Sequence, residues 1–75
     1  MTRFRELDSV VLVRDLPQHG LSSGSPGAVV HVHASDAVEV EFLRADGSTQ
    51  AVLTLPTDAL RGLHATEFVR ESPTN

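Results

Sequence analysis

The sequence predicts a small all-β domain in which four to five strongly bent antiparallel strands form a barrel. Two adjacent segments, "AVVHVHA" (28–34) and "AVEVEFL" (37–43), alternate apolar and polar residues, as half-buried antiparallel strands do. Asp46-Gly47 follows them and is a strong β-hairpin signal. The 75 residues allow one domain, and closing its sheet would protect Val-rich strand edges from aggregation.

The first expected strand is "SVVLVRD" (9–15), which is rich in β-branched residues. The next segment, 16–27, contains three Gly, two Pro and three Ser and is expected to be a loop. Long ordered loops often carry binding residues. We therefore take the following loop residues as candidate contacts with a partner: Pro17, His19, Leu21 and Ser23.

The central hairpin has one register that separates its apolar and polar faces. Pairing Val32 with Val40 places the apolar side chains of both strands on the same side and leaves a three-residue turn over 35–37. A slip of one residue would mix the two faces. This register places Val30 and Val32 in the core.

The same register gathers a polar patch on the outer face, with His31 opposite Glu41 and His33 opposite Glu39. Imidazole and carboxylate groups are ordinary zinc ligands. However, side chains two apart on a strand start nearly 7 Å apart, and an open sheet face excludes no water. We therefore interpret the patch as two cross-strand His–Glu pairs, with a weak metal site as an alternative.

The remaining residues supply the end of the sheet. "QAVLTL" (50–55) is the fourth expected strand, "PTDAL" (56–60) a single 3₁₀ turn, and about 60–63 a short fifth strand. The domain then spans 1–63, and 64–75 form a C-terminal tail that we expect to be partly disordered. The inward residues expected on the fourth strand are Ala51, Leu53 and Leu55.

Composition argues against several classes of function. The formal net charge is −4, and all six basic residues are arginine, which opposes binding to a phosphate backbone. The chain has no Tyr, Trp or Cys, so it lacks aromatic platforms for RNA or Pro-rich peptides, disulfides and thiolate metal sites. No apolar run approaches the roughly 20 residues that span a bilayer. The N-terminus lacks a signal peptide's apolar stretch, and we expect a cytoplasmic protein.

Catalytic and cofactor motifs are not specified either. The glycines of the 16–27 loop precede an expected strand, whereas phosphate-binding loops lead into a helix N-terminus. Serine and aspartate near His19 are ordinary turn residues, and no oxyanion donors are specified beside them. We expect no enzymatic activity and no cofactor.

The order of motifs resembles a family of short bacterial proteins known only as a domain of unknown function. The motifs that carry the resemblance are "LDSVVLVRDLP", "HGL" followed by "GSPGAVV", and "LP" with "LR" near Leu63. The resemblance implies an SH3-like barrel and supplies no catalytic residues. "GSPGAVVHVH" is also distantly similar to KOW modules and to the SH3-like part of the nitrile hydratase β subunit.

These observations favour a non-catalytic protein-interaction module. The family resemblance suggests the small partner, or antitoxin, of a neighbouring gene product. Contacts are expected at the 16–27 loop and at whichever sheet edge remains open, by addition of a strand. A homodimer formed through such an edge is a second possibility. The alternative is a KOW-like nucleic-acid or ribosome-associated module.

Overall fold

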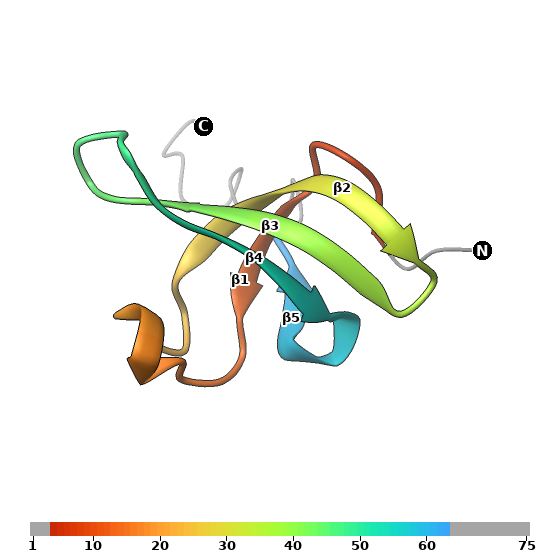
Figure 1. Ribbon diagram of the computed structural model, residues 1–75, viewed down its shortest axis with the longest axis horizontal. Helices are drawn as coiled ribbons and strands as arrows, with labels where there is room; N and C mark the ends of the chain where they lie inside the picture. Colours follow the sequence, from red (N-terminus) through yellow and green to blue (C-terminus); the bar gives the residue numbers. More distant parts are fainter. Residues whose placement is uncertain (1–3, 64–75) are drawn as a thin grey trace, which may run out of the picture.

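The computed structural model describes residues 4–63, which form five antiparallel strands in a single bent sheet (Figure 1). The strand order is β4–β3–β2–β1–β5. This confirms the predicted all-β class. The sheet is open, with β4 and β5 at its two edges; the tail expected over 64–75 lies outside the described residues. The strands are β1 (Ser9–Leu12), β2 (Pro26–Ala34), β3 (Ala37–Leu43), β4 (Thr49–Pro56) and β5 (Leu60–Gly62).

Two 3₁₀ turns occur in the described chain, where the sequence predicted a single one. The expected turn is η2 (Thr57–Ala59), which leads directly from β4 into β5. The additional turn, η1 (Pro17–His19), lies inside the long loop. Pro17 starts it with a fixed φ, and Gly20 ends it with φ of 70°. Proline and glycine therefore order this loop locally rather than leaving it irregular.

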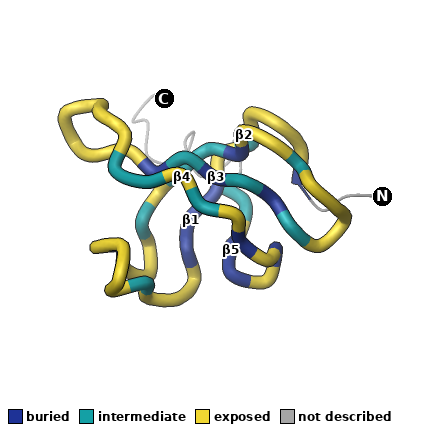
Figure 2. Tube along the Cα trace, viewed as in Figure 1, coloured by how far each residue is buried: buried dark blue, intermediate teal, exposed yellow. Residues whose placement is uncertain are grey.

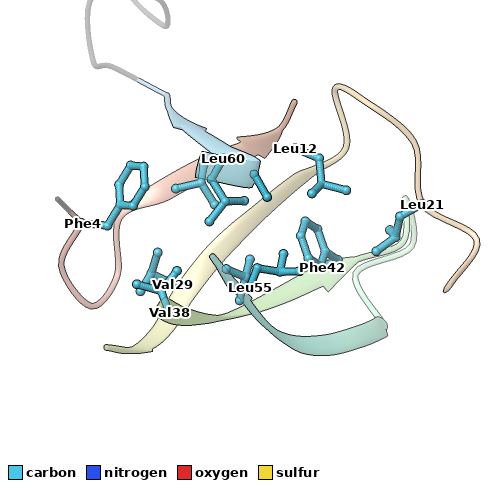
Figure 3. Packing of buried hydrophobic residues seen from close by; sticks show 11 residues of the cluster. Phe4, Leu12, Leu21, Val29, Val38, Phe42, Leu55 and Leu60 are labelled. Carbon is cyan, nitrogen blue, oxygen red and sulfur yellow. The ribbon is translucent and has the colours of Figure 1, made fainter. Parts of the chain in front are cut away.

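The core lies between the two halves of the bent sheet (Figure 3). Phe42 on β3 is fully buried, and Leu12 of β1 and Leu60 of β5 belong to the same core cluster. Figure 2 shows that the buried segments cluster where these strands meet, whereas the loops are exposed. On β4, Leu55 is buried and Ala51 and Leu53 pack partly against the core, as their alternation predicted.

The predicted register of the central hairpin is wrong. Val40 pairs with Val29 rather than with Val32, and Ala34 pairs with Ala37 across a two-residue turn. The shorter turn and two β-bulges account for the difference, since Val30 and His33 have no partner on β3. Each bulge inserts one extra residue into β2 and shifts the register by one.

The bulges also change which residue of β2 reaches the core. Val29 is completely buried, whereas Val30 is 41% exposed, the reverse of the predicted arrangement. A bulge places two successive residues opposite one, so the alternation of faces restarts after it. Val32 then returns to the inner face and packs partly against the core, as predicted.

Gly27 marks the position where β2 pairs with β1 and β3 at once. A Cβ added at Gly27 would lie 2.8 Å from Val40 Cγ1 and 2.9 Å from both the Glu41 carbonyl oxygen and Phe42 Cδ1. Those distances are shorter than van der Waals contact, so only glycine fits without displacing β3. The residue is required for close packing rather than for a left-handed backbone.

The predicted Asp46-Gly47 hairpin joins β3 to β4. Gly47 has φ of 90°, and Arg44 donates its backbone N–H to the Ser48 carbonyl oxygen at 2.8 Å. Asp46 Oδ1 accepts hydrogen bonds from the Ser48 amide at 2.9 Å and the Ser48 hydroxyl at 2.6 Å. These two bonds favour the ionised carboxylate and hold the Asp46 pKa below its ordinary value of 3.8.

We predict that Gly27→Ala destabilises the fold by about 1–3 kcal/mol, because the new methyl group overpacks the contact with Val40 and Phe42. Urea unfolding of the single variants and of the Gly27→Ala/Val40→Ala double variant measures this. Truncating Val40 removes the nearest clash, so the double variant should lose less stability than the two single losses added together. Strict additivity would contradict the steric explanation.

We predict that Ser48→Ala raises the Asp46 pKa toward 3.8, the ordinary value, as followed by the carboxyl carbon shift in an NMR titration. Because the pKa of Asp46 is lower in the folded state than in the unfolded state, the Asp46–Ser48 bonds contribute their full stabilisation at a pH above the ordinary pKa. This contribution is lost as the pH falls through the folded-state pKa. An unchanged Asp46 titration in Ser48→Ala would show that Ser48 is not the cause.

Candidate interaction surfaces

The predicted His/Glu patch lies on the outer face of β2 and β3, but its pairing differs from the expectation. His33 Nε2 lies 3.2 Å from Glu39 Oε1, which is the expected contact. His31 instead approaches Glu6, with its Nδ1 3.7 Å from Glu6 Oε2. Glu41 accepts a 2.6 Å hydrogen bond from the Thr49 hydroxyl on β4. The predicted His31–Glu41 pair is therefore wrong, because the two-residue turn and the bulge at His33 together place His31 opposite Glu39.

The geometry of this patch is that of separate pairs rather than of a ligand set. The rings of His31 and His33 meet edge to face, with centroids 4.6 Å apart. Their nearest carboxylates, on Glu6 and Glu39, come from different segments. Within residues 4–63, no three His, Cys, Asp or Glu side chains come together as metal ligands. All four polar residues remain partly solvated, so each pair contributes little stability.

The long loop carries its predicted contact residues in two different settings. Pro17, His19 and Ser23 are exposed, but Leu21 is 5% exposed and belongs to the core cluster. Leu21 and Leu16 exchange backbone hydrogen bonds of 2.9 and 3.1 Å around η1. Leu21 therefore anchors the loop and is not available to a partner, contrary to its proposed role. The sequence feature that could have predicted the burial of Leu21 is its apolar side chain within an otherwise polar loop.

Two further contacts attach the loop to the rest of the fold. Arg14 donates to Asp58 Oδ1 of η2 at 3.1 Å. At the loop tip, Gln50 Nε2 of β4 donates to the Gly20 carbonyl oxygen at 3.0 Å. Gln50 falls at a register irregularity between β3 and β4. The loop is thus tied near both ends of β4.

β4 is the longer of the two edge strands of the described sheet. It is eight residues long, whereas the opposite edge strand, β5, has three residues and contains Arg61. No residue of β4 is charged. Val52 is 47% exposed on its outer face, and Ala51 and Leu53 are half-buried on its inner face. Strand order alone makes β4 an edge, and the sequence pattern did not reveal that order.

A shallow depression of about 230 Å³ lies over β1, β2 and β3. Its size is below the roughly 300–1,000 Å³ of typical small-molecule sites. None of its lining residues has a titratable or metal-binding side chain, so the depression offers no group for catalysis or metal binding. The lining residues are Ser9, Pro26, Gly27, Ala28 and Leu43.

Leu7 is an additional feature that sequence reasoning missed. It has φ of 75°, the only positive φ of a non-glycine residue in the described chain. The surrounding turn fixes this conformation, because Leu7 donates its N–H to the Val29 carbonyl oxygen and Arg5 donates its N–H to Asp8 Oδ2. The Leu7 side chain is 85% exposed and so offsets none of the backbone strain by packing.

Comparison with protein families matches residues 6–62 to the model of Domain of unknown function (DUF4926). The chain belongs to this family. The match runs from the turn before β1 to the end of β5 and therefore covers all five strands. No curated protein and no solved structure matches the chain. Within residues 4–63, no helix has the length and apolar character needed to cross a membrane.

We predict that Leu7→Asn stabilises the fold by about 0.5–1 kcal/mol, since asparagine tolerates the left-handed region that costs other residues about 1–2 kcal/mol. Leu7→Ala is the matched control, because alanine has a Cβ as asparagine does but lacks the polar side chain that can hydrogen-bond to the local backbone. Chemical denaturation of both variants should show a gain for asparagine only. A loss in both would mean that the leucine side chain makes stabilising contacts.

Proposed function

We propose that this protein is a non-catalytic protein-interaction module that binds an extended segment of a partner protein along the edge of β4. The partner segment would form an additional antiparallel or parallel strand next to Thr49–Pro56. The observation that carries the proposal is the uncharged outer edge of this eight-residue strand, which pairs with no other strand within residues 4–63.

An exposed edge of this kind is usually protected. Proteins shorten edge strands, place charged residues or proline along them, or cover them with another element. The other edge strand is short and includes the charged Arg61. In β4, only the terminal Pro56 provides such protection. Backbone N–H and C=O groups along an edge give affinity for an added strand, and neighbouring side chains give specificity.

The side chains of β4 indicate what an added strand would contact. Ala51 and Leu53 face the core but remain half-buried, so an apolar residue of the partner strand would complete their packing. On the outer face, Val52 pairs with Glu41, and Thr54 pairs with Glu39. A partner strand with alternating apolar residues, and with uncharged or basic residues between them, fits both faces.

The strand order also supports an SH3-like architecture for this family member. The last strand follows a 3₁₀ turn and pairs with the first, while a long loop separates the first two strands. We propose that this family member is a small cytoplasmic bacterial protein. Its proposed cellular role is to act as the partner, or antitoxin, of a neighbouring gene product.

The test compares the wild-type chain with a Val52→Lys/Thr54→Lys variant. Each is used to purify the product of the adjacent gene, and binding is then measured calorimetrically with purified components. Both positions are on the exposed face of β4 and lie next to Glu41 and Glu39, so lysine does not disturb the fold by like-charge repulsion. We expect the double variant to weaken binding about tenfold or more.

Ala34→Lys/Ser35→Lys is the control, since it adds the same charge at the exposed β2–β3 turn. This control should bind as the wild type does. Equal binding by all three proteins would place the contact elsewhere, and no saturable binding by the wild type would contradict the proposed interaction.

A further inference from the structure

We propose that, in the absence of another partner, the edge of β4 is occupied by the β4 strand of a second copy of the chain. The two strands would run antiparallel about a two-fold axis and join two five-stranded sheets into one. This inference rests on the proposed function, because it assigns an occupant to the same edge.

The sequence of β4 is complementary to itself in this arrangement. With the two-fold axis at Leu53, Leu53 lies opposite its own copy and Ala51 lies opposite Leu55 of the other copy. Directly opposite residues of an antiparallel pair share a face, and all three of these residues face the core in one chain. On the outer face, Val52 lies opposite Thr54, a pair of β-branched side chains. The inner-face pairs are thus entirely apolar, and no pair brings charged side chains together.

Charge favours the same contact. The chain has a net charge of −4, so two copies repel each other over most approaches. β4 is the edge strand without charge, and the nearest carboxylates on β3, Glu39 and Glu41, are already bonded to His33 and Thr49. An uncharged strip along an edge therefore lets two acidic copies approach closely.

The second copy would also bury surface that one chain leaves half-exposed. Ala51 and Leu53 pack against the core from one side only. Leu53 and Leu55 of the second strand would cover their open side. A chain of 75 residues builds a thin core, and association adds buried apolar area that a single copy cannot supply.

The loop leaves this contact available. Two side-chain hydrogen bonds connect this region of the chain to the ends of β4: Gln50 donates to the Gly20 carbonyl oxygen, and Arg14 donates to Asp58 in the turn that follows β4. The middle of the strand, from Ala51 to Leu55, has backbone hydrogen bonds to β3 on one side only. Pairing over these five residues satisfies groups that the described chain leaves to solvent.

Sedimentation equilibrium of the 75-residue wild-type chain over a wide concentration range tests the proposal. We expect a reversible dimer with twice the mass of one chain, and stronger protection of the amides in 51–55 from hydrogen exchange as concentration rises. In Val52→Lys/Thr54→Lys, the lysine introduced at position 52 of one copy lies opposite the lysine introduced at position 54 of the other. These two like-charge pairs should raise the dissociation constant about tenfold or more.

The Ala34→Lys/Ser35→Lys control should dimerise as the wild type does. A wild-type chain that stays monomeric up to near-millimolar concentration overturns the dimer, and so does a dimer that the lysines introduced in β4 do not weaken. Neither outcome removes the proposed function, since a monomer whose β4 substitutions abolish binding of a different protein would still use this edge. Folding of every variant is checked by its amide NMR spectrum.

Discussion

Gly27 lies where β2 borders β1 and β3 at the same time, and the absence of a Cβ lets the backbone of β2 approach Val40 and Phe42. This close approach allows one strand to belong to both halves of the bent sheet. Residues 26–28 of β2 pair with β1, and residues 27–34, apart from the two bulged residues, pair with β3. The core forms in the space between these halves and includes the fully buried Phe42. Local turn signals then suffice to place the other strands, because each turn only has to position its strand beside the neighbouring one.

The sequence was sufficient to locate the five strands and the turn η2, but it did not predict the turn η1 or the register of the central hairpin. Alternation located β3 at Ala37–Leu43 without error, and Asp46-Gly47 located the hairpin that follows. The pairing of β2 failed because a continuous apolar-polar alternation carries no mark of a bulge. Val29 and Val30 are the same residue type, so pattern alone does not say which is buried. The twist of the sheet and the pairing of β2 with two neighbouring strands determine which valine is buried, and both are properties of the whole sheet.

The same limit explains what was correct and incorrect at the candidate surfaces. The His33–Glu39 contact survives the register error because a bulged residue remains close to the strand it fails to pair with. The His31–Glu41 pair does not survive, since the shift is larger nearer the start of β2. Leu21 was placed among contact residues by the composition of its neighbours, whereas its own apolar side chain determines its burial. Leu7 gave no signal, because a left-handed backbone at a non-glycine residue depends on bonds to Val29 and Asp8 that lie outside any local pattern.

Edge protection differs between the two sides of this sheet, and that asymmetry connects the fold to its proposed use. β5 is short and includes an arginine, features that discourage a foreign strand. β4 is long and uncharged, and its core-facing side is incompletely covered. Placing one lysine in β4 would protect the edge at little cost, since Glu39 and Glu41 are adjacent. An acidic chain with unprotected backbone groups on one edge is therefore suited to selective pairing, because its remaining surface repels other acidic chains while this strip accepts an uncharged or basic strand.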